Sequence, residues 1–395
     1  MRRRIMKPQR NRKMISDKQS FPRAGTIILF ALVTMGLVTA IIRFDRGLGA
    51  ITNLQDGRAW GLWISFDLYC GVALAAGGFV MAGAVYIFGL KKYYPVVRSA
   101  ILTAFLGYLM VIIALLVDLG QPWRIWHMII YWNPHSPLFE VGWCVLLYTT
   151  VLALEFSPAV FERFNMTVPL NWIRTIQIPL IITGIILSTL HQSSLGSVLL
   201  MMPGKIHPLW FSPVLPILFF LSAVTAGVAM TMLEVSFGSR VSGHRADLEI
   251  LGGLGKAMVF LLALFLAARL GDLLAAGKLK LIFISGRYSL MFLLETGIGV
   301  ILPLILFALP AVRRSRKGLL WSSLPVILGL ILHRLNVSLI ALMPRTGTFY
   351  FPHPLEFVIS ISIVAAGILA YLMASRYLPV ISQKGETEAA GIKIT

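Results

Sequence analysis

The sequence predicts an all-α, polytopic membrane protein with ten transmembrane helices. Apolar residues make up 57% of the 395 residues and charged residues only 13%, whereas a soluble globular chain carries roughly 25% charged residues. The mean hydropathy is +0.83. Ten apolar runs each approach or exceed the length of about 20 residues that crosses the hydrocarbon. Because lipid-exposed backbone must satisfy its own hydrogen bonds, every span should be a helix.

The first apolar run follows a basic segment, as a secretory signal would. It is longer than a signal core and no small-residue cleavage site comes after it, so we expect a retained anchor. Several later runs exceed the minimum length, which allows them to tilt. The expected spans are residues 24–43, 61–89, 96–118, 137–158, 171–201, 209–237, 251–272, 288–311, 318–343 and 354–378.

The basic residues predict the orientation of the chain. A formal charge of +19 would suit nucleic-acid binding, but most of the 35 Lys and Arg residues lie at the termini and in every second connection between spans. Connections rich in Lys and Arg stay in the cytoplasm. We therefore expect a multi-pass protein of the bacterial inner membrane, with both termini cytoplasmic and Arg124 and Lys278 on the outer side.

The two cysteines, Cys70 and Cys144, both lie inside apolar runs. Two thiols are too few for a disulfide framework, a cysteine-based zinc site or a cysteine-ligated iron–sulfur cluster. We expect no redox centre in this chain, so any electrons must come from a partner.

Two distant stretches repeat each other and predict a duplicated core, although apolar segments also resemble one another by chance. Residues 138–145 and 293–300 share a Glu, a Gly two positions later and a Val five positions later, and residues 190–191 and 332–333 share a Leu-His pair. We expect two parallel four-helix bundles plus two outer helices. The expected division is a basic cytoplasmic tail (1–23), the first helix with its outer loop (24–60), a first bundle (61–201), a second bundle (202–343), the last helix (344–378) and a cytoplasmic tail (379–395).

Charged side chains inside the spans need a reason, because each costs about 2.5–3.5 kcal/mol at the centre of a membrane helix. In the predicted orientation most of them lie in the outer half, and only Glu155 and Glu234 lie near the inner boundary. An aromatic outer loop that includes Trp126 and His127 should cover these groups on the outer side. The outer groups are Asp67, Asp118, Glu140, His191, Asp272, Glu295, His333 and Arg334.

For some of these groups a purely structural explanation competes with a functional one. Asp272 can simply meet interfacial water, and Glu295 with Arg334 can form a structural ion pair in the second bundle. Glu140 and His191 lie deeper than the interface on consecutive helices, where they could share a proton. We expect a functional role for that pair.

Three motifs resemble one known family. Residues 118–124 (DLGQPWR), followed by 126–128 (WHM), resemble the loop after the third helix in the membrane subunits of the polysulfide reductase and formate-dependent nitrite reductase superfamily. Residues 139–143 (FEVGW) and 189–196 (TLHQSSLG) look like the integral membrane subunit of hydrogenase-2-type nickel–iron hydrogenases. The resemblance covers about residues 24–378.

That resemblance implies a quinone-reactive subunit of a respiratory hydrogenase complex. A periplasmic ferredoxin-like iron–sulfur subunit would pass electrons from the hydrogenase large and small subunits to a quinone, with menaquinone as the first candidate and no haem in this chain. Proton translocation is left open. The chain departs from the eight-span branch, so the ligand residues on the first helix of that branch cannot be transferred.

Reduction of a quinone consumes two electrons and two protons, so its site needs an apolar slot and proton donors. We expect Glu140 and His191 to donate or relay the protons. Tyr148 and Glu234 would begin a path from the cytoplasm. The groups expected to orient or wall the quinone are Asp67, Asp118, Arg124, Trp126, His127 and Trp143.

Three alternatives stay open. A secondary transporter also uses parallel repeats and intramembrane charges, but it places them near the midplane. A haem b cytochrome could use His191 and His333 as ligands if both faced one cavity at the same depth. A structural anchor would carry no quinone, and extraction of co-purified quinone separates it from the quinone-reactive interpretation.

Overall fold

The computed structural model describes residues 23–57, 59–242, 247–342 and 350–380, and for residues 238–242 only the backbone. The predicted N-terminal and C-terminal tails therefore lie outside the described residues, apart from Arg23, Pro379 and Val380. Within the described part, ten helices are long and apolar enough to cross a membrane. The all-α class and the ten spans are confirmed.

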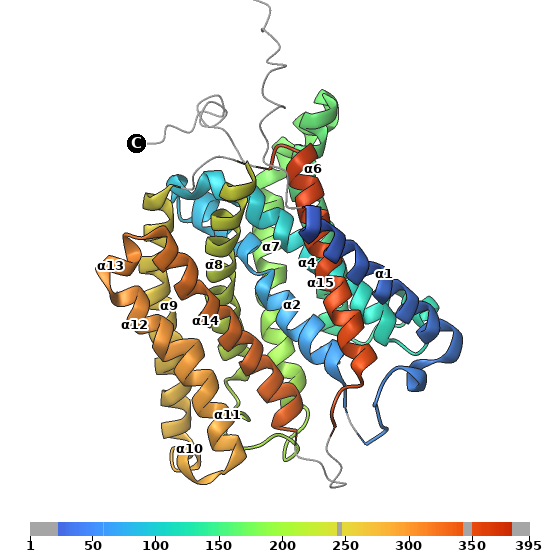
Figure 1. Ribbon diagram of the computed structural model, residues 1–395, viewed down its shortest axis with the longest axis vertical. Helices are drawn as coiled ribbons and strands as arrows, with labels where there is room; N and C mark the ends of the chain where they lie inside the picture. The colour runs from blue at the N-terminus through green and yellow to red at the C-terminus, as the bar shows by residue number, and fades with distance from the viewer. Residues whose placement is uncertain (1–22, 58, 243–246, 343–349, 381–395) are drawn as a thin grey trace, which may run out of the picture.

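Each predicted span corresponds to one helix or one run of helical segments (Figure 1). The spans are formed by α1 (Arg23–Arg46), then η3 (Trp63–Leu68) with α2 (Tyr69–Leu74), α3 (Gly77–Ala82) and η4 (Gly83–Ile87), then α4 (Tyr94–Asp118), α6 (Pro137–Phe164), α7 (Thr167–Leu200), α8 (Leu215–Ser242), α9 (Leu248–Ala275), then α11 (Arg287–Thr296) with η7 (Gly297–Ile301) and α12 (Leu302–Ala308), then α14 (Arg316–Leu335) with η8 (Asn336–Ile340), and α15 (Pro354–Tyr377).

Short helices occupy the connections between the spans. They are η2 (Leu48–Ala50), η5 (Lys91–Tyr93), η6 (Pro122–Arg124), α5 (His127–Ile130), α10 (Leu281–Ile284) and α13 (Pro310–Arg313). Among the described residues β-pairing is limited to an isolated bridge between Ile206 and Leu342.

The helix contacts connect the two halves of the chain through α8. In the first half α6 packs on α7 and α4 packs on α3 and α6, while α8 contacts α3 and α7 on one side and α9 and α14 on the other. Helix α1 packs on α15, which also contacts α4 (Figure 1). The grouping into two four-helix bundles stays a prediction, and we keep "first bundle" and "second bundle" as names for residues 61–201 and 202–343.

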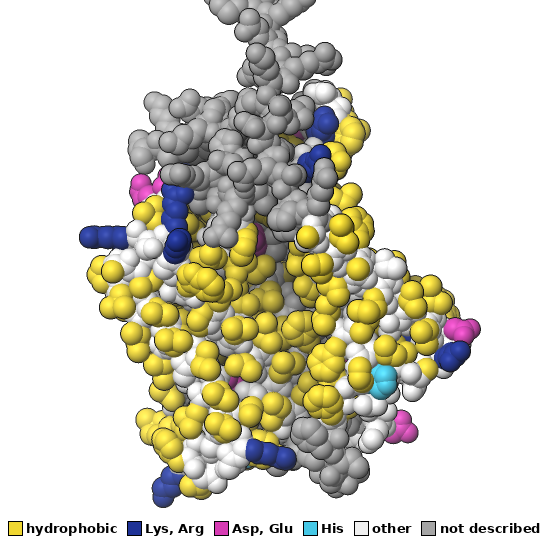
Figure 2. Space-filling view, viewed as in Figure 1, with side chains coloured by type: hydrophobic (Ala, Val, Ile, Leu, Met, Phe, Trp, Pro, Cys, Tyr) yellow, Lys and Arg dark blue, Asp and Glu magenta, His cyan; other side chains and the backbone are white. Residues whose placement is uncertain are grey.

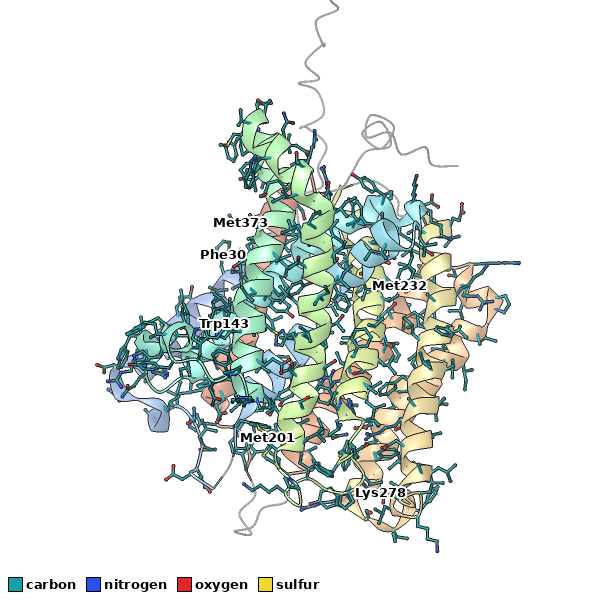
Figure 3. The ribbon with its side chains drawn as sticks, turned by 180° about the vertical axis from the view of Figure 1, so that it is seen from behind. Phe30, Trp143, Met201, Met232, Lys278 and Met373 are labelled. Atoms are coloured by element: carbon teal, nitrogen blue, oxygen red, sulfur yellow. The ribbon has the colours of Figure 1, made fainter. Side chains whose placement is uncertain are left out.

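The surface is that expected for a protein surrounded by lipid. Apolar side chains cover the middle of the molecule and the visible Lys and Arg lie toward its two ends (Figure 2). Apolar side chains on the outside need no partner in hydrocarbon, so large ones such as Phe30, Trp172 and Phe260 stay exposed. Seen from behind, Met201 and Lys278 mark one end of the molecule, which we predict to be the outer end (Figure 3).

Local signals explain several helix ends. Helix α6 continues through Pro158 to Phe164, beyond the predicted end at residue 158, and stops at Asn165 in the left-handed region (φ 56°), as many helices do. Helix α15 starts with a capping box in which the His353 ring accepts from a backbone N–H and Glu356 accepts from the His353 N–H. These caps satisfy orphan backbone donors.

Among the described residues, four segments of the spans are π-helical, with wider turns than an α-helix: η3, η4, η7 and η8. Three of them contain or adjoin buried polar groups. Asp67 lies inside η3, Glu295 comes just before η7, and Asn336 begins η8. Wide turns of this kind are rare and are frequent at functional sites. The sequence pattern did not predict them, because hydropathy is the same for an α-helix and for a π-helical turn.

Candidate functional site

Buried polar side chains gather in three places, which we name by position. The outer cluster consists of Arg43, Asp67, Asp118, Tyr350, Glu356 and Ser360. The first-bundle track consists of Ser65, Thr103, Tyr108, Tyr148, Ser188, His191 and Gln192. The second-bundle cluster consists of Trp210, Arg269, Glu295, His333 and Asn336. Each is described in turn.

The outer cluster ties the last span to the second. The Ser360 hydroxyl on α15 donates to an Asp67 carboxylate oxygen on η3 at 2.6 Å. Glu356, which is buried, accepts from the Tyr350 hydroxyl and from the Asn53 backbone N–H, the latter at 3.0 Å. Asp67 therefore lies in a buried polar environment, and its partner comes from a helix outside the predicted repeat.

Arg43 holds α1 against the end of α4. Its guanidinium is buried and donates to the carbonyl oxygens of Val117, at 2.6 Å, and Leu119. These carbonyls belong to the C-terminal end of a helix, where backbone acceptors lack partners and a cation is favoured. The charge of Arg43 also acts on the nearby Asp118 carboxylate.

Two titratable groups outside the spans have shifted pKa values. Burial raises the pKa of Tyr350, and the hydrogen bond that its hydroxyl donates to Glu356 raises it further. Burial lowers the pKa of His207, whose ring stacks on Tyr288 with ring centroids 4.2 Å apart. Both groups therefore favour their neutral form at neutral pH.

The aromatic outer loop packs beside α6. The Trp143 indole on α6 donates to the Met128 carbonyl at 3.0 Å, and the Trp132 and Trp143 rings lie 4.8 Å apart. Trp126 stacks edge-on against His127 at 4.2 Å. Trp126 is nevertheless half exposed and Arg124 is exposed. The structure thus joins Trp143 to the loop, while its contacts do not join the loop to Asp67 or Asp118.

The structure does not bring Glu140 and His191 into contact, contrary to the expectation that they share a proton. Glu140 lies half-buried in the first turn of α6. His191 is fully buried on α7, and its Nδ1 forms a hydrogen bond of 2.8 Å with the Tyr108 hydroxyl on α4. Tyr108 carries no charge and was not predicted, because a buried tyrosine in an apolar helix looks like a core residue.

The first-bundle track is notable for polar atoms without a partner among the described residues. The rings of Tyr108 and Tyr148 meet edge-on with centroids 4.7 Å apart. The unpartnered buried atoms are Ser65 Oγ, Thr103 Oγ1, Tyr148 OH, Ser188 Oγ, His191 Nε2 and Gln192 Oε1. Buried polar atoms are nearly always hydrogen bonded, to protein or to ordered water. Internal water molecules in the track would therefore supply the missing hydrogen-bond partners of these atoms.

Two acids, Glu155 in the first bundle and Glu234 in the second, lie near the end of the spans that we predict to be the inner one, and we call them the inner acids. Glu234 on α8 is buried and accepts from the Ser99 hydroxyl at 3.4 Å, and Ser99 is 2.9 Å from the Tyr371 hydroxyl on α15. Glu155 on α6 is half-buried. Glu155 and Tyr148 lie beside the same residue of α7, since a Cβ added at Gly184 would be 3.2 Å from Glu155 Oε1 and 3.6 Å from Tyr148 Cε2. Glu155 is therefore close to the track.

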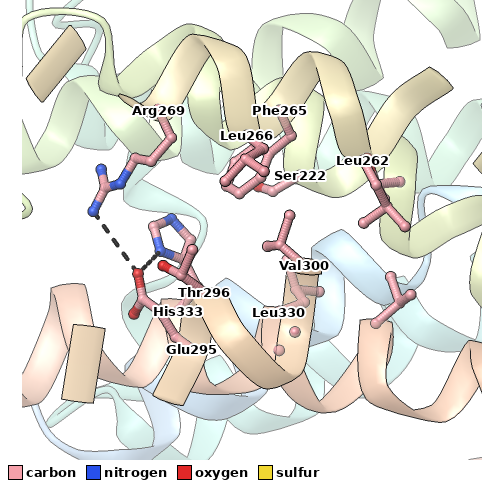
Figure 4. A pocket seen from close by; sticks show the side chains of 14 residues that line it. Ser222, Leu262, Phe265, Leu266, Arg269, Glu295, Thr296, Val300, Leu330 and His333 are labelled. Atoms are coloured by element: carbon pink, nitrogen blue, oxygen red, sulfur yellow. Dashed lines mark hydrogen bonds and ion pairs between the residues drawn. The ribbon is translucent and has the colours of Figure 1, made fainter. Parts of the chain in front are cut away.

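The second-bundle cluster is built around one carboxylate (Figure 4). Glu295 accepts from the Trp210 indole at 3.1 Å and from the Asn336 amide at 2.5 Å. His333 Nδ1 lies 3.2 Å and Arg269 Nη2 lies 3.8 Å from the same Glu295 oxygen. The five side chains come from three spans and from the segment before α8, so they fix the relative positions of these helices.

The predicted ion pair between Glu295 and Arg334 is wrong. Arg334 donates to the Phe219 carbonyl and to the Ser222 hydroxyl, each at 3.0 Å, and its guanidinium lies 3.5 Å over the Phe219 ring. Consecutive residues of a helix point about 100° apart, since a turn takes 3.6 residues. His333 faces Glu295, so its neighbour Arg334 cannot.

A small cavity adjoins this cluster. The space inside it that the centre of a water molecule can reach is about 30 Å³. Hydroxyl groups of Ser222, Thr225 and Thr296 line it together with Arg269, Glu295 and His333 (Figure 4). It is the size of a water site and is far smaller than an ordinary ligand pocket. Among the described residues no group of His, Cys, Asp and Glu could hold a metal ion.

Comparison with known proteins gives one family. The model of the family "Polysulphide reductase, NrfD" matches residues 51–343. The "Probable Ni/Fe-hydrogenase 2 b-type cytochrome subunit" of Escherichia coli is 36% identical, over 90% of this chain and 92% of its own length. The "Menaquinone reductase, integral membrane subunit" of Nitratidesulfovibrio vulgaris is 28% identical over 91% of both chains. Another N. vulgaris protein is 40% identical, over 93% of this chain and 96% of its own length.

Proposed function

The chain belongs to the NrfD family of polysulphide reductase membrane subunits, and from this premise we propose that it is the quinone-reactive membrane subunit of a respiratory nickel–iron hydrogenase complex. In this role it takes electrons from an iron–sulfur subunit on the outer face and delivers them to menaquinone. Two similar proteins support the proposal by their names, since one is a hydrogenase 2 subunit and the other a menaquinone reductase subunit.

The observation that carries the proposal is the first-bundle track. Quinone reduction needs protons as well as electrons, and protons cross an apolar core only along hydrogen-bonding groups and water. The track supplies six buried polar atoms with free hydrogen-bonding capacity on η3, α4, α6 and α7. It lies between the inner acids, Glu155 and Glu234, and the outer carboxylate of Asp67.

The proposed roles follow from position. Glu234 and Tyr148 begin the inner part of the path, and His191 passes a proton outward. Asp67 and Asp118 orient the quinone at the outer end of the first bundle, with Glu140 as the proton donor on α6. Trp143, Trp126, His127 and Arg124 form the wall on the side of the aromatic loop.

Reduction of the quinone adds one electron and one proton at each ring oxygen. The electrons come from the partner's cluster, because the two cysteines of this chain are buried singly and unpaired. If the protons rise from the cytoplasm, each charge crosses the membrane potential at about 2.3 kcal/mol per 100 mV. Protons taken from the outer side would not cross the membrane potential, so this energy would not be involved.

We propose no haem in this chain, although one relative is named as a b-type cytochrome subunit. His191 on α7 and His333 on α14 bind different partners through Nδ1, namely Tyr108 and Glu295. The cavity beside His333 has room only for water. These residues do not fit a haem held between the two rings. An absorption spectrum of the purified chain, with no Soret band, is the expected result.

The proposed setting is the bacterial inner membrane with both termini in the cytoplasm. The partners are a periplasmic ferredoxin-like iron–sulfur subunit and the hydrogenase large and small subunits. The apolar belt of the molecule supports a membrane setting (Figure 2). The concentration of Lys and Arg at the termini and in every second connection supports the orientation.

The variant Glu140→Gln tests the proposal. In the purified complex we expect it to abolish hydrogen-dependent menaquinone reduction, because an amide cannot deliver a proton. Hydrogen oxidation with an artificial dye should continue at the wild-type rate, since it bypasses this chain. Glu249→Gln, at the first turn of α9, is the matched control and should retain both activities.

Two outcomes contradict the proposal. Full menaquinone reduction by Glu140→Gln removes that residue from the mechanism. Absence of quinone from lipid extracts of the wild-type complex, together with hydrogen-dependent reduction that is unaffected by removing this chain, removes the quinone-reactive role.

A further inference from the structure

The two histidines inside the spans are held in opposite ways. His191 and His333 occupy matching Leu-His positions of the predicted repeat. Each uses Nδ1 for a hydrogen bond and leaves Nε2 buried without a partner among the described residues. Their Nδ1 partners differ, however, and the partner of one ring nitrogen decides whether the other carries a proton.

His333 faces a carboxylate, which fixes the direction of its hydrogen bond. Glu295 also receives the Trp210 and Asn336 N–H groups and lies close to Arg269. A carboxylate in such surroundings is ionised and can only accept. His333 must therefore donate its Nδ1 proton, and in the neutral ring Nε2 is left as a bare acceptor.

His191 faces a phenol, so the direction of its Nδ1 hydrogen bond is the opposite one: the phenol donates and Nδ1 accepts. The Tyr108 hydroxyl has one proton to give and lies 2.8 Å from His191 Nδ1, with the Ser188 side chain also beside it. Donation to Nδ1 avoids an orphaned buried O–H, which would be costly. The neutral His191 ring then carries its proton on Nε2, so its free nitrogen is a donor.

The surroundings of His333 suit a trapped water molecule. The space that a water centre can reach in the cavity it lines is about 30 Å³, which exceeds the roughly 10–15 Å³ that a cavity needs to hold a water. Arg269, which also lines it, keeps Nη1 unpartnered and buried. The Phe265 ring lies 6.0 Å from the imidazole and lines the cavity with it, and the Phe219 ring lies 6.0 Å from the imidazole as well.

We propose that the second bundle contains a buried water site in which Arg269 Nη1 donates to the water and His333 Nε2 accepts from it. The neutral His333 ring keeps its proton on Nδ1, where Glu295 accepts it, and offers Nε2 to the water as an acceptor. His191 in the first bundle instead offers an Nε2–H donor. It goes beyond the proposed quinone chemistry and does not depend on it.

The charged groups around His333 come from three helices. Glu295 on α11 contacts Nδ1 at 3.2 Å, and Arg269 on α9 lies 3.8 Å from the same Glu295 oxygen. Arg334 on α14 is directed away toward Phe219 and Ser222. Glu295 is therefore the charged group that holds the ring, and its removal should change His333 and leave His191 unaffected.

The experiment is nitrogen NMR of the full chain, labelled with ¹⁵N-histidine and reconstituted in lipid nanodiscs. His191→Gln and His333→Gln assign the two signals. At neutral pH we expect His333 to be protonated at Nδ1 and bare at Nε2, with a contact between Nε2 and a water proton. His191 should be protonated at Nε2 and bare at Nδ1.

Two variants give a crossed control. Glu295→Leu should change the His333 signals alone, and Tyr108→Phe should change the His191 signals alone, whereas Glu295→Gln keeps an acceptor and should retain the His333 form. A wild-type His333 that is protonated at Nε2, or that shows no water contact, overturns the proposal. The wild-type spectrum decides even if a variant fails to fold. Because neither hydrogen nor quinone is needed, failure of the quinone proposal leaves this result unaffected.

Discussion

Single side chains hold together the end of the molecule that we predict to face outward. Arg43 is 3% exposed and its guanidinium donates to two carbonyl oxygens at the end of α4. A buried cation of this kind stabilises the fold only while its acceptors are in place. The neighbouring Arg46, by contrast, has a side chain that is 74% exposed.

Replacement of Arg43 by Gln should lower the free energy of unfolding by about 2–3 kcal/mol, since hydrogen bonds to charged groups contribute about 1.5–3 kcal/mol. Thermal unfolding of the detergent-purified protein measures the change. The control Arg46→Gln should stay within about 0.5 kcal/mol of the wild type. Equal melting temperatures for the two variants would contradict the role given to Arg43.

His207 should make stability depend on pH. Its pKa is lowered by burial in the folded chain, so the unfolded chain binds a proton first as pH falls. The contribution of His207 is therefore fully present above the unfolded value of about 6.5 and is lost as pH falls below it. The protonated ring also loses the bond that Nδ1 accepts from the Leu209 N–H at 3.3 Å.

Thermal melts at a series of pH values test this prediction. Between about pH 7 and 5 the wild type should lose more stability than His207→Gln, because the variant has no proton to bind. Parallel melting curves for the two proteins across that range would show that His207 does not titrate differently in the folded chain.

At the scale of elements, close helix packing brings the second-bundle cluster together. Segment η7, which follows Glu295, approaches α14 so closely that a Cβ added at Gly299 would lie 2.3 Å from the Gly329 Cα. Gly297 lies in the same π-helical segment, yet a Cβ there would meet nothing within 4 Å. The two glycines are therefore a matched pair, one inside the contact and one outside it.

Gly299→Ala should destabilise the protein by about 1–3 kcal/mol, the usual cost of overpacking, because two backbones must move apart. Gly297→Ala should be neutral or stabilising by up to about 1 kcal/mol. Chemical or thermal unfolding in detergent gives both values. If the two variants unfold alike, the packing of η7 on α14 is looser than described.

At the scale of the whole molecule, the orientation in the membrane is a prediction from charge alone. It can be tested with single cysteines, since the native Cys70 and Cys144 are 1% and 5% exposed and should react slowly. Ser315, the N-cap of α14, belongs to the predicted inner face, and Lys278, near α10, belongs to the outer face (Figure 3).

A membrane-impermeant maleimide should label Lys278→Cys in intact spheroplasts and should label Ser315→Cys only after the membrane is opened. The positive-inside rule gives this result because the basic segments stay in the cytoplasm. The reverse pattern would place the termini outside and would remove the physical basis of the proposed quinone site.

The sequence determined the membrane class, the ten spans and the family, because these depend on composition, on apolar length and on short motifs. It also indicated charged side chains near the predicted outer ends of the spans, because a charged residue inside an apolar run is easy to recognise. It could not assign partners. Glu295 and Arg334 looked like a pair, but the helical turn sends Arg334 toward Phe219, and Glu295 meets His333 and Arg269 instead.

Only the tertiary structure decided which groups meet across helices. Tyr108 and Trp210 are uncharged, so nothing in the sequence separates them from core aromatics until their hydrogen bonds to His191 and Glu295 are known. The π-helical turns, too, follow from packing and have no hydropathy signal. The reason is physical: hydropathy reports transfer into lipid one residue at a time, whereas the direction of a side chain depends on the rotation and contacts of its helix.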